Sequence, residues 1–189
     1  MYTNAERIVL PIARVTIGQA LGRQAAADES APWLQELKAC FVTLKIDGDL
    51  RGCIGSLHAQ RSLLADLKAN ALAAAFHDPR FEPLSDDELN CTRIEVSLIS
   101  AVEPMYFANE QDALSQLRPA IDGVIFEYQS WRSTFLPQMW ESLPTPQVFM
   151  GLLKKKAGLS PSFWAEGIRL SRYTVLRFHE AEHEENLYS

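Results

Sequence analysis

The residues best suited to chemistry stand together in the hexapeptide Leu-Arg-Gly-Cys-Ile-Gly at residues 50–55. In an extended strand, side chains two residues apart lie on one face, so Arg51 and Cys53 are expected to share a face. A guanidinium beside a thiol favours the thiolate, which is the form that attacks electrophiles or binds metals. The flanking glycines, Gly52 and Gly55, allow backbone or ligand to approach closely.

Cys53 and Arg51 each have a structural interpretation beside the chemical one. Free cysteine is among the most buried residue types, so Cys53 is either a nucleophile or a small residue packed between close backbones. Arg51 either binds a carboxylate or phosphate through its forked guanidinium or forms a structural salt bridge, for example with Glu95. Cys40 and Cys91 are interpreted as core or edge thiols. The sequence leaves both alternatives open for Cys53 and for Arg51.

Two further candidates lie on the polar face of a strand predicted at residues 92–99. Apolar and polar residues alternate along this segment, which predicts a half-buried strand. Glu95 and Ser97 fall on its polar side, and Glu95 is therefore a candidate general base or orienting group. The alternative is an ordinary solvated sheet face.

A short loop after a predicted helix contributes second-tier candidates. Asp78 and Arg80 flank Pro79, where an Asp-Pro turn and a loop anchor are the structural interpretation. His77 precedes them and either carries protons or complements the dipole at the end of the helix. The 4 histidines show no ligand spacing, so no metal site is predicted. The chain has no phosphate-binding loop, dinucleotide fingerprint or Ser-His-Asp signature, and no cofactor is predicted.

The bulk properties bound the class of protein. A chain of 189 residues, 47% hydrophobic and 22% charged, can form one large domain or two small lobes with a packed core. A net charge of −6 argues against a general nucleic-acid binder. The 3 cysteines lack a Cys-x-x-Cys motif and indicate reduced thiols. With no signal peptide and no apolar run approaching the roughly 20 residues that span a bilayer, we expect a cytoplasmic protein that binds neither membrane nor nucleic acid.

Hairpins dominate the predicted elements. Residues 40–46 and 50–54 form strands around a tight turn at 47–49, and residues 62–76 form the clearest helix. A first helix covers 5–21, where Pro11 is awkward and offers an alternative start. The other predicted elements are helices at 85–89, 109–117 and 145–157, extended segments at 124–128 and 131–136, and a last strand at 169–178. Because the strands follow one another as hairpins, the sequence predicts an α+β fold with a largely antiparallel sheet and flanking helices.

The C-terminal segment is interpreted separately. Residues 180–189 are acidic and predicted to be disordered. The sequence at 185–188 resembles the start of an engineered protease site, which leaves the origin of residues 185–189 open.

Several motifs occur in a recognisable order. The hexapeptide precedes Ala-Ala-Phe-His-Asp-Pro-Arg-Phe at 74–81, Pro-Leu at 83–84 and Ile-Glu-Val-Ser at 94–97. Asp-Gly-Val at 122–124, Thr-Phe-Leu-Pro-Gln at 134–138, Lys-Ala-Gly-Leu at 156–159 and then Trp164 follow. Together these motifs resemble the AMMECR domain family over about residues 8–178.

The resemblance implies a single α+β domain, here residues 5–179, which is also described as two unequal lobes, with a smaller lobe at about 56–91. It implies that the hexapeptide faces a cleft, with the Asp78–Arg80 loop nearby. The chain also resembles family members of the AmmeMemoRadiSam system, which implies a Memo-type protein and a radical-SAM enzyme as partners.

Two hypotheses follow from the residues and the resemblance together. In the first, the protein is an enzyme in which Cys53 is the nucleophile, Arg51 holds an anionic group and Glu95 assists proton transfer. Its substrate-binding residues would be Gly52, Gly55, Asp78, Arg80 and Ser97. In the second, it is a non-catalytic binding module for a partner protein or for a reactive intermediate of that system.

Overall fold

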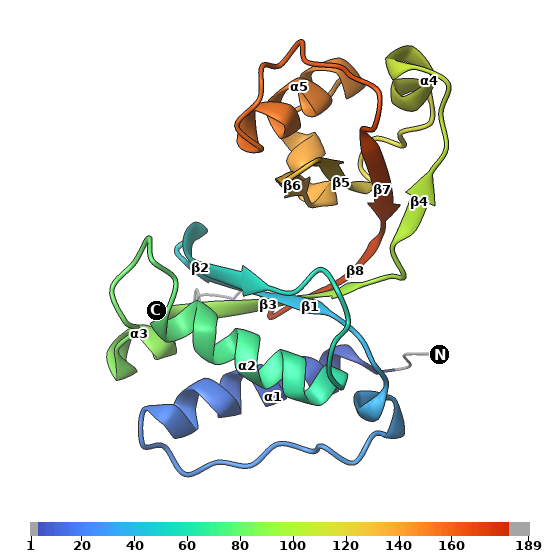
Figure 1. Cartoon of the computed structure of the whole chain (residues 1–189). Coiled ribbons are helices and arrows are strands. Elements are labelled where there is room, and N and C mark those ends of the chain that lie inside the picture. The colour runs from blue at the N-terminus through green and yellow to red at the C-terminus, as the bar shows by residue number, and fades with distance from the viewer. Residues whose placement is uncertain (1–3, 182–189) are drawn as a thin grey trace. The chain divides into compact units, whose positions relative to one another are not determined.

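The computed structural model describes residues 4–181 and groups them into two compact units (Figure 1). The first unit contains residues 4–99 and 176–181, and the second contains Ser100–Val175. Each unit has a four-stranded antiparallel sheet with helices, which confirms the α+β prediction. The segment 56–91, predicted as a smaller lobe, lies within the first unit.

The first unit is a sheet with two long helices on one face. Its strands are ordered β2-β1-β3-β8, so β2 and β8 are the edge strands. Helix α2 contacts β1 and β2, and helix α1 contacts α2 and β3. The elements are α1 (Glu6–Ala20), η1 (Pro32–Gln35), β1 (Cys40–Ile46), β2 (Asp49–Gly55), α2 (Leu63–Phe76), α3 (Asp86–Cys91), β3 (Thr92–Ile99) and β8 (Val175–His179).

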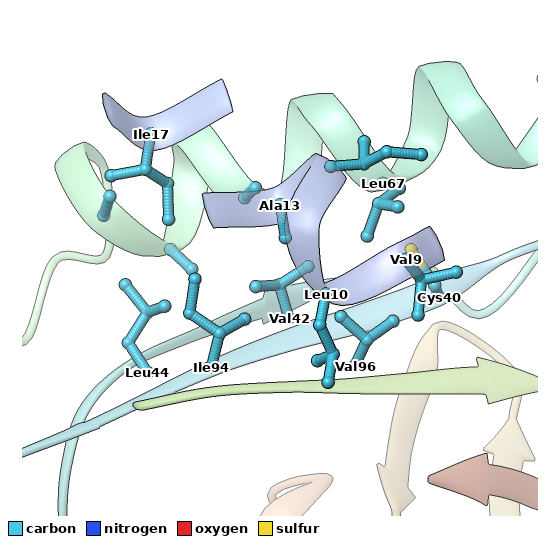
Figure 2. Packing of buried hydrophobic residues seen from close by; sticks show 14 of the residues in the cluster. Val9, Leu10, Ala13, Ile17, Cys40, Val42, Leu44, Leu67, Ile94 and Val96 are labelled. Atoms are coloured by element: carbon cyan, nitrogen blue, oxygen red, sulfur yellow. The ribbon is translucent and has the colours of Figure 1, made fainter. Parts of the chain in front are cut away.

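The core of this unit lies between the helices and the sheet (Figure 2). Every second residue of β1 points into it, and Cys40, Val42 and Leu44 are fully buried. The helices cover them with residues at helical spacing, among them Ile17 of α1 and Leu67 of α2. Burial of these apolar faces is the main force that holds α1 and α2 on the sheet.

Helix α1 begins at Glu6 and includes Pro11. The alternative start at Pro11 is therefore wrong. Pro11 is exposed, so its ring points away from the core and the missing hydrogen bond is its main local cost. Thr3 stands at capping-box spacing before Glu6, but it lies outside the described residues.

Strand β8 and the residue after it close the first unit. The N–H of Glu180 donates to the carbonyl of Ile94, and its carboxylate accepts from Nε of Arg14 at 2.6 Å. Glu180 is the first residue of the segment predicted to be disordered, and it is held by these bonds. Residues 182–189, including the sequence at 185–188, lie outside the described part of the chain.

The second unit packs helices against one face of its own sheet, ordered β4-β7-β5-β6. Its centre is aromatic: the rings of Trp140 and Phe149 stack with centroids 3.9 Å apart. Buried Lys154 donates to Glu110 and to the carbonyl of Phe163. The elements are β4 (Glu103–Met105), α4 (Glu110–Ser115), β5 (Gly123–Tyr128), β6 (Trp131–Phe135), η2 (Pro137–Glu141), α5 (Pro146–Lys156) and β7 (Arg169–Tyr173).

The single strand predicted at 169–178 is wrong, because the structure has two strands there in different sheets. Thr174 separates them, and its N–H donates to the hydroxyl of Ser100 instead of entering a strand ladder. Strand β4 was not predicted, since three residues carry too little periodicity to be recognised.

Helix α2 touches the backbone of β2 at Gly52. A Cβ at this position would lie 2.2 Å from the carbonyl oxygen of Ala74, far inside any real contact distance. Gly52 pairs with Leu44 and therefore faces the helices. The glycine is required by helix–sheet packing.

We expect Gly52→Ala to destabilise the protein by about 1–3 kcal/mol, since the added methyl group forces α2 away from the sheet. Urea unfolding followed by circular dichroism measures the change. Gly151→Ala in helix α5 is the matched control: its Cβ would lie 3.5 Å from the nearest atom, and removing a helical glycine stabilises by about 0.5–1 kcal/mol. Equal stability of Gly52→Ala and the wild type would contradict the packing argument.

Candidate functional site

A β-bulge decides which way Cys53 faces. The β1–β2 register shifts between Leu44 and Lys45, which leaves Arg51 as the additional residue on β2. Beyond the shift, Cys53 pairs with Thr43, whose side chain lies on the face opposite to the helices. Without the shift, Cys53 would fall on the covered face, because a slip of one residue exchanges the two faces of a strand. The pairing thus skips Arg51, and the shared face expected for Arg51 and Cys53 stays a prediction.

Cys53, Thr43 and Glu95 form one row across three strands. Thr43 pairs with Cys53 on one side and with Glu95 on the other. The thiol sulfur of Cys53 lies 3.2 Å from the hydroxyl oxygen of Thr43, within hydrogen-bond distance. Adjacent strands are about 4.8 Å apart, so Glu95 stands roughly 10 Å from Cys53 along the row, with Thr43 between them.

Two cations flank the carboxylate of Glu95. Nζ of Lys45 lies 3.5 Å from one oxygen and Nε of Arg177 lies 3.6 Å from the other. Glu95 is only 8% exposed and Ser97 only 2%. These two residues are therefore buried, and the alternative of a solvated sheet face is wrong. A buried carboxylate needs such cations, because burial without a partner is costly.

Asp78 and Arg80 form hydrogen bonds with the backbone of Cys53 at the unpaired edge of β2. The N–H of Cys53 donates to Oδ2 of Asp78 at 2.8 Å, and a terminal nitrogen of Arg80 donates to the carbonyl of Cys53 at 3.3 Å. Arg80 also donates to both oxygens of Asp78, at 2.9 and 2.7 Å. These two side chains satisfy backbone groups that a neighbouring strand would otherwise bind.

The buried carboxyl of Asp78 is strongly stabilised as an anion. Its pKa lies well below the usual range, first because Arg80 donates to it and then because the N–H groups of Cys53 and Arg80 also do. The structure therefore brings together Cys53, Asp78 and Arg80, and the guanidinium at the backbone of Cys53 is that of Arg80.

Arg51 forms a structural salt bridge, as one of its two interpretations proposed, but its partner is Glu88 and not Glu95. Nε of Arg51 lies 2.8 Å from Glu88, and a terminal nitrogen donates to the carbonyl of Glu82. The Phe81 ring lies 5.8 Å from the guanidinium of Arg51 and 5.5 Å from that of Arg80, which places it within cation–π range of both. Arg51 thereby fixes helix α3 and the preceding loop to the bulge.

The pairing with Arg51 lowers the pKa of the Glu88 carboxyl to about 2, and the backbone N–H of Ser85 adds to the effect. This second contact belongs to a complete capping box at the start of α3, in which Ser85 is the N-cap residue. One carboxylate thus serves both the helix and the arginine of the hexapeptide.

The remaining predicted residues have different environments. Gly55 lies under the ring of Phe41, where a Cβ would be 2.2 Å from the nearest ring atom. Cys40 is fully buried in the core, and burial raises the pKa of its thiol. Cys91 is exposed at the end of α3. Cys40 is therefore the core thiol that the sequence predicted. The roles of Gly52, Gly55 and Ser97 as substrate contacts stay predictions.

The sequence did not single out Thr43, Lys45 or Arg177 as members of the row. A tight turn at 47–48 without a bulge would pair Thr43 with Gly52, so only knowledge of the bulge could have identified it. Arg177 comes from β8, whose pairing with β3 is not visible in local sequence. Across residues 4–181, no group of three or more His, Cys, Asp or Glu side chains could hold a metal ion.

Two four-stranded antiparallel sheets with their helices define the chain as an α+β protein. The structure of an uncharacterized protein from Pyrococcus horikoshii is similar, with a TM-score of 0.84 and 27% identity, and the match covers 92% of this chain and 90% of that one. None of the helices within residues 4–181 is long and apolar enough to cross a membrane.

Sequence comparison then identifies the family. The AMMECR1 family model matches residues 10–178, and the chain belongs to this family. A protein from Methanocaldococcus jannaschii is 33% identical over 179 residues, covering 90% of this chain and 87% of that protein. A protein from Thermotoga maritima is 37% identical over 161 residues, covering 83% of this chain and 87% of its own length.

The Arg51–Glu88 pair predicts a specific pH dependence. The folded-state pKa of Glu88 is depressed, so its contribution to stability is present above the unfolded-state value near 4.5 and is lost as pH falls through about 2. We expect Glu88→Gln, which retains the capping-box geometry, to be less stable than the wild type at pH 6. The difference should shrink steadily as urea unfolding is measured at pH values from 5 to 2.

Glu82→Gln removes the same charge from the neighbouring loop and serves as the control. Its stability difference from the wild type should be small at every pH, since the contact of Arg51 with residue 82 uses the backbone carbonyl. A Glu88→Gln difference that does not change with pH would contradict a contribution from the charged pair.

Proposed function

We propose that the protein is a thiol-dependent enzyme in which Cys53 attacks, or forms a transient adduct with, an electrophilic substrate. The observation that carries this proposal is the row of Cys53, Thr43 and Glu95, with the thiol at hydrogen-bond distance from the hydroxyl. A structural cysteine packed in the core, as Cys40 is, has no need of such a row.

The row supplies the groups that such a step needs. As the sulfur of Cys53 bonds to an electrophilic atom, a π bond or the bond to a leaving group at that atom breaks, and the thiol proton must leave. In the proposal, the hydroxyl of Thr43 accepts this proton and gives up its own, and Glu95, the carboxylate next along the row, is the base that finally takes it. Lys45 and Arg177 pair with the carboxylate of Glu95 and hold it in place. Thr43 thus acts as the link between thiol and base.

Arg80, with Asp78, is the better-placed candidate for the cationic role first assigned to Arg51. Arg51 uses its guanidinium on Glu88 and on the Glu82 carbonyl. Arg80 touches the backbone of Cys53 and has a side chain that is 53% exposed. In the proposal it offers forked donors to an anionic substrate.

A binding or accessory function is the second candidate. It is favoured by the structural duties of the hexapeptide: Gly52 contacts α2, Gly55 lies under Phe41, and Arg51 pairs with Glu88. In this second proposal, the hexapeptide serves only to stabilise the fold of the first unit. Under either function, the proposed partners are the Memo-type protein and the radical-SAM enzyme that the family resemblance implies, in the cytoplasm.

Alkylation by iodoacetamide separates the two functions. We expect Cys53 to react faster at pH 7 than exposed Cys91, although Cys53 is less exposed. Peptide mass spectrometry measures the alkylation of Cys53 and of Cys91 in one sample. Thr43→Val should slow labelling of Cys53 about threefold or more without affecting Cys91. Thr134→Val, on a strand of the second unit, is the matched control and should leave both rates unchanged.

The cationic role has its own test. Arg80→Gln should slow labelling of Cys53 at pH 7 by a similar factor, because the nearby positive charge is lost. Arg93→Gln removes a charge from β3 and should have no effect. A Cys53 that resists alkylation in the folded protein up to pH 9, yet reacts once unfolded, would exclude the nucleophile. Full activity of Cys53→Ser in a system reconstituted with both partners would favour the binding module.

A further inference from the structure

The connection between β2 and α2 forms a pocket in the first unit, separate from the polar row. Its volume is about 460 Å³, within the 300–1,000 Å³ range typical of small-molecule sites. Its lining residues come from the segment after β2, which ends at Gly55, and from the first turn of α2, which begins at Leu63. The lining residues are Ser56, Leu57, His58, Gln60, Arg61 and Asp66.

A buried carboxylate fixes the shape of this pocket. Asp66, which is 2% exposed, accepts hydrogen bonds on one oxygen from Ser56 and Arg61, each at 2.8 Å. Its other oxygen accepts from the N–H of Cys40 and from Asn70, each at 2.9 Å. Four donors to one carboxylate secure both ends of the loop to the sheet and to α2.

The same carboxylate prepares Arg61 to bind a ligand. Only Nε of Arg61 is used by Asp66. Among the described residues, neither terminal nitrogen of Arg61 has a hydrogen-bond partner, and the side chain is 45% exposed. A guanidinium held by one nitrogen presents the other two as a forked donor with little entropy left to lose.

The rest of the lining suits a small polar molecule. The amide of Gln60 and the imidazole of His58 are hydrogen-bonding groups on the same wall, and Leu57 adds an apolar surface. Because both oxygens of Asp66 already accept hydrogen bonds from four donors, the terminal nitrogens of Arg61 are the donors left for a ligand. Forked guanidinium donors match the oxygens of carboxylate and phosphate groups.

We propose that this pocket binds a small molecule through a carboxylate or phosphate group, with Arg61 as its anchor and Gln60 and His58 as further contacts. The site is independent of Cys53. A ligand here contacts the loop that follows β2, whatever reaction the thiol performs.

NMR titration of the ¹⁵N-labelled full chain at low ionic strength tests this proposal, with inorganic phosphate and malonate as separate probes and chloride as the ionic-strength control. We expect saturable shifts confined to residues 56–66 with at least one of the two probes. Phosphate alone would identify phosphate as the recognised group, and malonate alone would identify carboxylate.

Arg61→Gln should weaken this binding about tenfold or more, since the forked donor is lost. Arg23→Gln is the matched control: Arg23 also pairs through Nε with an aspartate, Asp86, but outside the pocket. Gln60→Ala leaves the Asp66 bonds intact and should weaken binding about threefold even if Arg61→Gln perturbs the loop. Absence of saturable shifts, equal shifts with chloride, or unchanged affinity in both pocket variants would overturn the proposal.

Discussion

The contact between the backbone of Gly52 and the carbonyl of Ala74 sets the geometry of the first unit. It brings the C-terminal part of helix α2 directly against strand β2, where any side chain would separate them. Since α2 ends at Phe76, the following loop emerges beside the free edge of the same strand. Asp78 and Arg80 can therefore hydrogen-bond to the backbone of Cys53. The position of the thiol thus depends on Gly52 having no Cβ.

This arrangement divides the hexapeptide between two tasks. Gly52, Ile54 and Gly55 serve packing, and Arg51 ties the bulge to α3 through Glu88. Cys53 has its backbone held at the strand edge and its sulfur beside Thr43. Of these residues, Cys53 is the one whose side chain joins the polar row, which is why the functional argument rests on it.

Local chemistry made much of this fold predictable. The turn at Asp47–Gly48 and the alternating residues of β1 indicated the hairpin, and the predicted bounds of β1 and β3 agree with the structure. Two helices were predicted to start at Ser62 and Thr145, and these residues are the N-caps of α2 and α5. These features depend on residues within a few positions of each other, so sequence alone contains them.

The parts that could not be predicted depend on pairings distant in the sequence. Nothing in the hexapeptide signals that Arg51 is the extra residue of a bulge, yet this decides the face of Cys53. The partner of Arg51 was equally hidden, because Glu88 and Glu95 are similar carboxylates and only the path of the chain after α2 selects one. Glu95 is buried because β1 and β8 each bring a cation to it, and strand order is a property of the whole unit.

The first unit is discontinuous in the chain, since β3 ends at Ile99 and its neighbour β8 begins at Val175. During synthesis, one edge of β3 stays unpaired until the entire second unit has been made. The bonds of Arg14 to Glu180, of Arg93 to Ala181 and of Glu95 to Arg177 likewise form only when this last segment arrives. Arg177, which pairs with Glu95 of the polar row, is thus made only after the whole second unit, and a chain that stops before β8 would present an unprotected β-edge to its neighbours.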